Sequence, residues 1–389
     1  MSHNAVVLGA GMGGLTTTAQ LRELLPDEDR IIVVDRSFEN VQGLSLLWLL
    51  RGWRSLDQVR VVPSKDALTG VDQVTGTVEE LDLANHQVRT TSGSVAYDAL
   101  IVALGAALNT AAVPGLDDAL ASGVAAHYYA PHAALDAHQK LRRIRSGRVV
   151  FLVTGTPYKC PAAPYEGAML AADLLTETGA RPKVSVDVYT PEPQPMPVAG
   201  HVVGQGVISM LDTAGIGFHP GHQVDHVDTT ARQVAFTDGQ TVLFDLLVFI
   251  PPHQPPAPVT AAGFSPAGWI PVDPRNLTTP TRGVWALGDV ASITLVNGKP
   301  LPKAAVFATG QAQAVAAGVA SHLGYDAPRT RFAGDGHCYL ETGGHMAARG
   351  AGNFYHPDGP KITLSAPSQE LHRAKEHEEA DWITHWSQG

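Results

Sequence analysis

The chain contains two cysteines, Cys160 and Cys338, and they are the side chains best suited to nucleophilic or redox chemistry. Cys160 lies where a predicted strand gives way to a helix, with Lys159 before it and Pro161 after it. A thiol at a helix N-terminus beside a lysine has its thiolate favoured, and the thiolate is the reactive form. The separation of 178 positions alone fits two unrelated buried thiols. The setting of Cys160 instead predicts a reactive sulfur.

A second group of residues predicts a dinucleotide site near the N-terminus. An apolar strand at 5–8 is followed by the pattern G-x-G-x-x-G, whose glycines are Gly9, Gly11 and Gly14. Glycine permits the tight turn and the close approach of a pyrophosphate, which the following helix N-terminus attracts. Asp35, with Arg36 after it, ends the next strand 21 residues after Gly14, where an acid can bind ribose hydroxyls.

The elements that carry these residues alternate between apolar strands and helices, which predicts parallel, doubly wound sheets. Strands at 5–8 and 30–35 enclose a helix at 15–25, and the same order recurs about 140 residues later. We therefore expect an α/β fold with two Rossmann-like dinucleotide-binding domains and a C-terminal α+β piece. The predicted division is an FAD-binding domain (1–110 plus 270–330), a second Rossmann-like domain (111–269) and a C-terminal cap or acceptor-docking region (331–389).

The choice of FAD rests on the stretch that ends at Asp289. Residues 283–289 resemble the segment that closes flavoproteins with two dinucleotide domains, in which the matching aspartate bonds the ribityl chain of FAD. The strand that ends at Gly105 resembles the connecting strand of the same class. The second unit has only one glycine in its turn at 153–161, and its next strand ends at Thr190 without an acid. A nicotinamide site is therefore not expected there, and another reductant must supply the flavin.

Three segments together resemble the sulfide:quinone oxidoreductases and the flavoprotein subunit of flavocytochrome c sulfide dehydrogenase. Residues 156–166 resemble the first cysteine motif of that family, and residues 302–311 resemble the segment that places a lysine near the flavin pyrimidine. His337, Cys338 and Tyr339 resemble the second redox cysteine and its neighbours. The likeness spans essentially the whole chain.

The resemblance implies that Cys160 and Cys338 form a redox pair, joined as a disulfide in the oxidised enzyme. Sulfide would attack the disulfide, leaving one cysteine as a persulfide and the other as a thiolate that reduces the flavin. Lys303 would stabilise negative charge on the reduced flavin. Side chains expected to take part in acid–base steps are Glu166, His132 and His201.

The sequence also departs from that family. Many relatives have a third functional cysteine, and this chain has none. Residues 38–43, where the flavocytochrome relatives attach FAD through a cysteine, offer no thiol, so we expect noncovalent FAD. The acidic C-terminal stretch at 374–386 carries Trp382 and Trp386 one helical turn apart, which favours a packing or docking helix over a bilayer anchor.

Composition limits the partners. A net charge of −10 without a basic block argues against nucleic acid, and no metal site is expected. The expected partners are sulfide or a small sulfur species and a quinone or cytochrome acceptor. We expect a cytoplasmic protein, with room for a peripheral contact at the inner membrane face and for a homodimer. Two alternatives stay open: a type II-like NAD(P)H:quinone dehydrogenase, and a flavin-binding regulatory protein without turnover.

Overall fold

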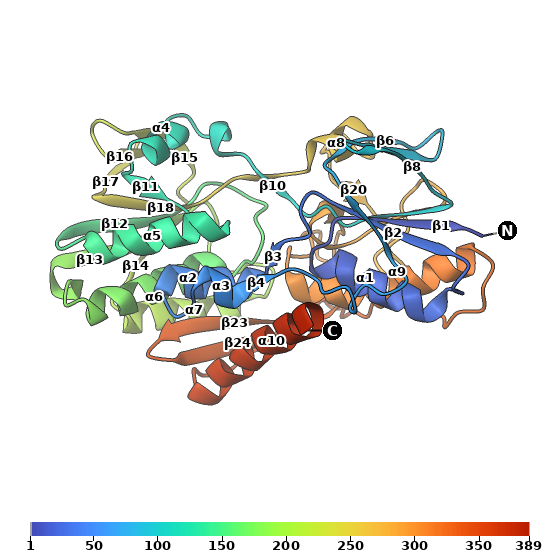
Figure 1. Ribbon diagram of the computed structural model, residues 1–389. Coiled ribbons are helices and arrows are strands. Elements are labelled where there is room, and N and C mark those ends of the chain that lie inside the picture. The colour runs from blue at the N-terminus through green and yellow to red at the C-terminus, as the bar shows by residue number, and fades with distance from the viewer. Residues whose placement is uncertain (1, 389) are drawn as a thin grey trace.

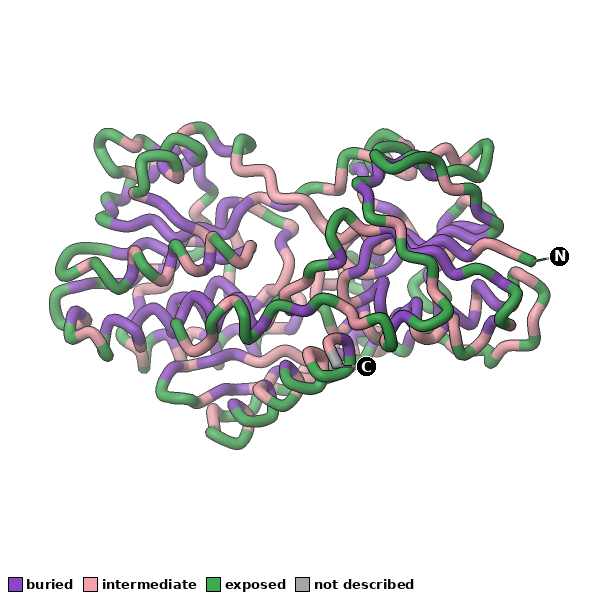
Figure 2. The backbone as a smooth tube through the Cα atoms, viewed as in Figure 1, coloured by how far each residue is buried: buried purple, intermediate pink, exposed green. Residues whose placement is uncertain are grey.

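The computed structural model describes the backbone of residues 2–388 and the side chains of residues 2–387. Two α/β units lie side by side, and a smaller sheet with the last helix lies beneath their junction (Figure 1). Buried residues concentrate in the central strands of both units, and exposed residues lie on the outer turns and helix surfaces (Figure 2). The α/β fold with two parallel Rossmann-like sheets is confirmed.

The first unit is built on a parallel sheet in the order β21-β9-β1-β2-β5. Alternate residues of β1 (Asn4–Leu8) face opposite sides, because successive side chains of a strand do so. Ala5 and Val7 pack toward helices α1 (Met12–Leu24) and α9 (Ala305–His322). Val6 and Leu8 pack toward an antiparallel sheet of three strands: β6 (Val78–Asp82), β7 (Gln87–Thr90) and β8 (Gly93–Ala96).

The remaining strands of this sheet come from distant parts of the chain. They are β2 (Arg30–Asp35), β5 (Asp72–Thr75), β9 (Ala99–Val102) and β21 (Val284–Ala286). Since β21 pairs with β9, the chain returns to the first sheet after completing the second unit. The division into 1–110 plus 270–330, 111–269 and 331–389 stays a prediction.

The second unit repeats the first. Its parallel sheet has the order β11-β18-β12-β13-β14. The strands are β11 (Ala125–Ala126), β12 (Gly147–Val153), β13 (Val184–Thr190), β14 (Gly217–Pro220) and β18 (Leu246–Ile250). Helix α6 (Ala163–Glu177) packs on one face, and an antiparallel sheet covers the other with β15 (Val224–Asp228), β16 (Gln233–Phe236) and β17 (Thr241–Leu243).

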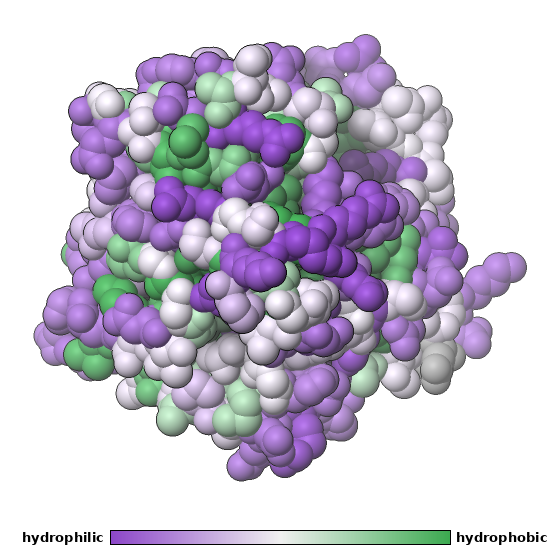
Figure 3. Space-filling view, turned by 90° about the vertical axis from the view of Figure 1, so that its left-hand side faces the viewer, coloured by the Kyte–Doolittle hydropathy of each residue, from purple (hydrophilic) through white to green (hydrophobic). Residues whose placement is uncertain are grey.

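Two further helices flank α6. Helix α2 (Gly43–Arg51) and helix α5 (Pro131–Arg143) contact each other, and both contact α6. Residues 45–51 of α2 are all buried, so this apolar stretch is a core helix. Between the described ends of the chain, we find no helix that combines the length and apolar character of a bilayer span. On the face at the end of the second unit, apolar residues lie in small groups among polar ones (Figure 3).

The C-terminal piece is an antiparallel sheet of β23 (Asp335–Gly343), β24 (Met346–Asn353) and β25 (Lys361–Leu364), followed by α10 (Gln369–Gln388). Strand β23 contacts both α6 and α9, so it bridges the two units, and α10 lies on β24. Trp386 is buried, with its ring 5.6 Å from that of Trp382. Helix α10 therefore packs against the protein through this tryptophan pair.

Candidate active site

Cys160 lies on the turn between β12 and α6. Its backbone is left-handed, with φ of 58°, and its N–H donates a 2.7 Å hydrogen bond to the carbonyl of Lys303. Its own carbonyl accepts from the N–H of Ala163, the first residue of α6. Bonds to both sides of the residue fix the direction in which the thiol points.

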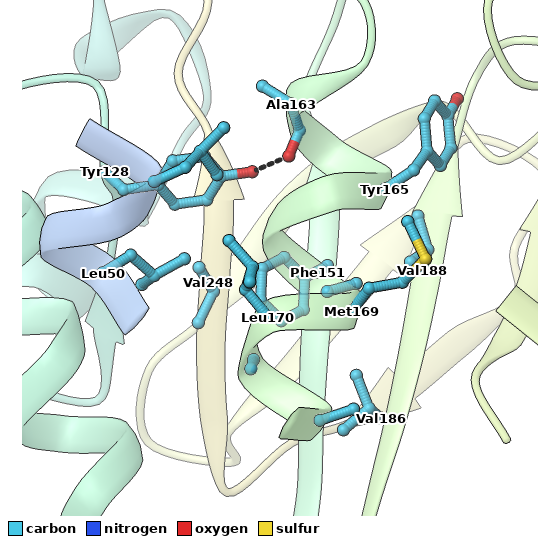
Figure 4. Packing of buried hydrophobic residues seen from close by; sticks show 14 of the residues in the cluster. Leu50, Tyr128, Phe151, Ala163, Tyr165, Met169, Leu170, Val186, Val188 and Val248 are labelled. Carbon is cyan, nitrogen blue, oxygen red and sulfur yellow. Dashed lines mark hydrogen bonds between the residues drawn. The ribbon is translucent and has the colours of Figure 1, made fainter. Parts of the chain in front are cut away.

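The core of the second unit holds α6, and thereby Cys160, in place. Met169 and Leu170 of α6 lie over Phe151, Val186 and Val188 of the sheet (Figure 4). The Tyr128 hydroxyl donates a 2.7 Å hydrogen bond to the carbonyl of Ala163. Gly167 makes this contact possible, since a Cβ there would lie 2.6 Å from the Tyr128 hydroxyl oxygen.

Cys338 comes from the middle of β23, yet it meets Cys160 in space. The two cysteines are 4.3 Å apart, and both are free thiols in this structure. The neighbouring Cys338 thiol holds the pKa of Cys160 below its ordinary value. The proximity of Cys160, together with burial, raises the pKa of Cys338 well above its ordinary value. Of the two sulfurs, Cys160 is therefore the one that more readily carries a negative charge.

The pair lies at one end of a cavity of about 320 Å³ that extends to the glycine-rich turn. Gly11 and Met12 border the cavity where α1 begins, and Ala305 and Val306 border it where α9 begins. Two helix N-termini thus face the same space, and each favours negative charge. Further predicted residues that line it are Gly105, Asp289, Lys303, Glu166, Cys160 and Cys338.

The glycine-rich turn has the geometry that a dinucleotide needs. A Cβ at Gly14 would lie 1.8 Å from the carbonyl oxygen of Gly9, and one at Gly9 would lie 2.5 Å from that of Ala103. These two glycines therefore allow the turn itself to close. A Cβ at Gly11 would meet nothing within 4 Å, so Gly11 borders open space suited to a pyrophosphate.

Asp35 and Arg36 are outside this set. Within the described chain, neither is among the residues that line the cavity. The Asp35 carboxylate accepts hydrogen bonds from the N–H groups of Ala10, Ser37 and Phe38, which tie the end of β2 to the glycine-rich turn. Arg36 is exposed beside it. Their predicted contact with a ribose stays a prediction.

Lys303 lies between Cys160 and Asp289. Its ammonium donates a hydrogen bond to the carbonyl of Asp289 and lies 3.6 Å from the centre of the Trp269 ring. Burial lowers its pKa from 10.5 to about 8, and the charge of Asp289 opposes that shift only in part. Lys303 can therefore change its charge in the range where most enzymes work.

Glu166 is fully buried at the inner wall of the cavity. It forms a salt bridge with Lys375 of α10, whose ammonium also lies 3.6 Å from Glu341 of β23. Burial raises the pKa of Glu166, outweighing the attraction of Lys375. Burial lowers the pKa of Lys375, but the two glutamates outweigh burial and raise it. Both shifts favour the protonated forms of Glu166 and Lys375.

The structure does not bring His132 or His201 to this cavity. His132 is exposed in the first turn of α5. His201 is exposed at the start of α7 (His201–Thr213), where its Nδ1 lies 3.3 Å from Oε1 of Gln194. Their predicted acid–base roles have no support from this placement.

Lys375 and Glu341 border or support the site, and the sequence analysis did not identify either of them. The stretch at 374–386 predicts a packing or docking helix, because acids and tryptophans dominate it. A lone lysine among acids gives no sign that its helix docks on β23. The local signal was a single glutamate beside the buried Leu340 in β23, since a buried acid needs a partner.

A second cavity, of about 310 Å³, shares Cys338, His337 and Lys303 with the first. Apolar side chains make up most of its walls, among them Met196, Val198, Ile293, Leu301, Phe307, Phe354 and Ile362. The shared residues make the wall between the two spaces only one residue thick at Cys338 and Lys303. The second cavity suits a flat, apolar molecule.

Comparison with known proteins gives a consistent result. The family described as pyridine nucleotide-disulphide oxidoreductase matches residues 3–312. A mitochondrial sulfide:quinone oxidoreductase of Dictyostelium discoideum is 25% identical over 332 residues, 82% of this chain and 70% of that protein. A sulfide-quinone reductase of Aquifex aeolicus is 26% identical over 320 residues, 78% of this chain and 71% of that protein.

Among solved structures, the sulfide:quinone oxidoreductase of Aquifex aeolicus superimposes with a TM-score of 0.85 at 21% identity. The superposition covers 98% of this chain and 91% of that one. At that identity the likeness concerns the fold, and it includes the C-terminal piece that carries Cys338.

Proposed function

Because the chain belongs to the pyridine nucleotide-disulphide oxidoreductase family, we propose that it is an FAD enzyme that oxidises sulfide through Cys160 and Cys338. It is a flavin-dependent oxidoreductase, similar to sulfide:quinone oxidoreductases. One observation carries the proposal: two cysteines 178 positions apart meet in one cavity with the glycine-rich turn. Neither packing nor nucleotide binding requires that meeting.

The residues of the cavity fit FAD. Gly11 leaves room for the pyrophosphate at the N-terminus of α1, and Asp289 is suited to bind ribityl hydroxyls. The start of α9 and the Lys303 ammonium provide positive potential next to the cysteines. When bound, FAD supplies a two-electron acceptor for sulfur chemistry. Noncovalent binding is part of the proposal, because residues 38–43 contain no thiol.

The sulfur chemistry needs both cysteines. HS⁻ attacks one sulfur of the Cys160–Cys338 disulfide, so that a new sulfur–sulfur bond forms as the old one breaks. One cysteine then carries a persulfide, and the other is a thiolate that holds the electron pair. The sulfane sulfur leaves as polysulfide or on a thiol acceptor. The separation of 4.3 Å between the two cysteines supports this pairing, which needs only a small adjustment of the two side chains.

We propose quinone as the acceptor, on the strength of the apolar cavity beside Cys338. A cytochrome would need an exposed docking surface rather than an enclosed apolar space of this kind. Lys303 reaches both cavities, so its charge acts on the sulfur side and on the acceptor side. The wall shared by the two cavities gives electrons a short path between them.

The NAD(P)H alternative is weakened by the turn that follows β12. Tyr158 occupies this turn and donates a 2.6 Å hydrogen bond to Glu192, which follows β13. A carboxylate beside the turn repels phosphate, and Pro157 and Pro161 have no N–H to bind one. Rapid bleaching of the flavin by micromolar NADH would favour the dehydrogenase alternative. A regulatory flavoprotein would bind FAD but stay oxidised with every sulfur donor.

Anaerobic addition of sulfide to the FAD-loaded protein tests the proposal. We expect the flavin absorbance to bleach with sulfide and to recover with a soluble quinone. Cys338→Ser should keep its FAD and lose the bleaching, because no disulfide can form. His377→Ala, on an exposed part of α10, should behave as wild type. Unchanged bleaching in Cys338→Ser would disprove the paired mechanism.

A further inference from the structure

One acidic side chain lies in the wall of the apolar cavity beside Cys338. It is Glu192, which follows β13, and it is the one carboxyl group among the described residues that line this cavity. On the basis of the proposed function, we propose that Glu192 gives a bound quinone one of the two protons that convert it to quinol. Within the described chain, Glu192 is not among the residues that line the cavity with the cysteines, so its role concerns the acceptor side.

Two tyrosines fix the orientation of the Glu192 carboxyl group. The Tyr158 hydroxyl donates a 2.6 Å hydrogen bond to Oε2 of Glu192, and the Tyr165 hydroxyl donates a longer one of 3.4 Å to the same oxygen. Both tyrosines are buried, and the Tyr165 hydroxyl points away from the apolar core of the second unit (Figure 4). Oε1 has no hydrogen-bond partner among the groups that the structure describes. Oε1 is therefore the oxygen that can carry a proton and present it to a ligand.

The surroundings of Glu192 favour its protonated form. Burial raises the pKa of the carboxyl group, and the hydrogen bonds from Tyr158 and Tyr165 and the charge of Lys299 oppose that rise only in part. Lys299 is exposed, and its ammonium donates a 2.9 Å hydrogen bond to the carbonyl of Pro197. Since a negative charge in an apolar wall is costly, Glu192 keeps its proton at a higher pH than an exposed glutamate does. Such a carboxyl group is suited to act as a general acid.

The other ionisable groups of the cavity direct their hydrogens elsewhere. Lys303 donates to the carbonyl of Asp289, and Nε2 of His337 lies 3.0 Å from Glu378. Asp289 and Glu378 line the cysteine cavity. Lys303 and His337 thus face the wall that the two cavities share, whereas Glu192 lies away from it. A quinone ring has an oxygen at each end, so one oxygen can face the shared wall while the other meets Glu192.

Glu192 can recover its proton from water without a path through the interior. Its side chain is partly exposed, and Pro193 and Gln194 line a surface depression of about 350 Å³. Pro197 and Val198 line both this depression and the apolar cavity, so the two spaces adjoin. Glu192 therefore lies between the space for the quinone and the solvent that supplies the proton.

The overall reaction takes up one proton, and Glu192 supplies it. HS⁻, a quinone and one proton become sulfane sulfur and a quinol. The proton that HS⁻ loses accompanies the electron pair through the flavin and accounts for one hydrogen of the quinol. The second O–H bond of the quinol forms as the O–H bond of Glu192 breaks. Glu192 is then a carboxylate until water restores its proton.

Glu192→Gln tests this role, because the amide oxygen can still accept from Tyr158 while the acidic proton is lost. The flavin is reduced with sulfide and mixed anaerobically with decylubiquinone, and its reoxidation is followed by absorbance. We expect reoxidation about a hundredfold slower than in wild type, with bleaching by sulfide unchanged. The matched control is Asp358→Asn, an exposed acid of the surface depression paired with His356, which should behave as wild type. Wild-type reoxidation in Glu192→Gln would overturn the proposal.

Two further measurements distinguish an acid from a residue that only shapes the cavity. Glu192→Ala leaves space beside Tyr158, so added acetic acid should restore its reoxidation rate, whereas Glu192→Gln should show no rescue. Without turnover, a redox-inert hydroxyquinoline N-oxide should shift the infrared band of the protonated Glu192 carboxyl group, which is identified by its absence in Glu192→Gln. An unshifted band would overturn the contact with the ligand. Loss of N-oxide binding in Glu192→Gln would make Glu192 a binding residue and overturn its role as an acid.

Chemical reduction separates this proposal from the proposed function. If sulfide fails to bleach the wild-type flavin, the proposed function fails, but dithionite still reduces the flavin and decylubiquinone is added as before. Slower reoxidation in Glu192→Gln than in wild type would support the role of Glu192 even then. Equal rates in the two proteins would overturn that role on its own, as would a wild-type flavin that decylubiquinone does not reoxidise.

Discussion

At the scale of single residues, tertiary contacts and burial set the ionisation of the site residues more than their sequence neighbours do. Lys159 adjoins Cys160 in the sequence, but the pKa of Cys160 is held down chiefly by Cys338, which is 178 positions away. Lys303 is a lysine whose pKa falls to about 8 because it is enclosed by Trp269 and backbone carbonyls. Both residues were predicted from the sequence, whereas their altered ionisation comes from tertiary contacts.

The pH dependence of turnover should report Lys303. Its ammonium is charged below pH 8 and loses its charge as the pH rises through 8. If that charge stabilises negative charge near the cysteines, turnover should fall above pH 8. Lys303→Arg should move this alkaline limb upward, because a guanidinium stays charged. Lys303→Met should remove the limb and lower turnover about a hundredfold at pH 7. An unchanged limb in Lys303→Arg would assign it to another group.

At the scale of elements, the alternation of strands and helices could be read directly from the sequence. The strand predicted at 30–35 matches β2, and the strand predicted at 5–8 matches β1 within one residue. Helix α1 begins three residues earlier than predicted, at Met12, because Gly13 and Gly14 are helical. Glycine lowers helix propensity, but here the close packing against Leu287 and Gly9 requires it.

Different glycines of the glycine-rich turn serve folding and FAD binding, and two substitutions should distinguish these roles. Gly11→Val places a side chain in open space, so the protein should fold with near wild-type stability and lose FAD. Gly14→Ala places a Cβ 1.8 Å from the Gly9 carbonyl, so the turn itself should fail and the protein should lose stability. Thermal unfolding and the flavin content of the purified proteins measure the two effects. Stoichiometric FAD in Gly11→Val would place the pyrophosphate elsewhere.

At the scale of the whole molecule, the site depends on contacts that no local pattern reveals. Glu166 and Lys375 are 209 positions apart, and their contact exists only because α10 docks beside α6. The periodicity of α10 predicts a helix. Its contacts with β23 and β24 depend on the way β23 packs against α6 and α9, which the periodicity does not reveal. For the same reason the sequence placed His132 and His201 by family position, and the fold leaves both of them exposed.

The folded protein should bind FAD noncovalently, without any covalent bond between the flavin and the chain. Acid precipitation should leave all of the flavin in the supernatant, because residues 38–43 offer no thiol for attachment and both cysteines lie at the redox site. The ratio of flavin in the supernatant to flavin in the pellet measures this. Flavin that stays with the precipitated protein would contradict noncovalent binding.

The position of Cys338 in the bridging strand β23 has a consequence for the order in which the protein is made. Chains emerge from the ribosome N-terminus first, and domains tend to fold as they appear. The glycine-rich turn and Cys160 are synthesised long before Cys338. A nascent chain would therefore carry Cys160 as a lone thiol, without the contact from Cys338 that lowers its pKa, until β23 has been made. The two cysteines can therefore come together only after β23 has been synthesised, late in translation.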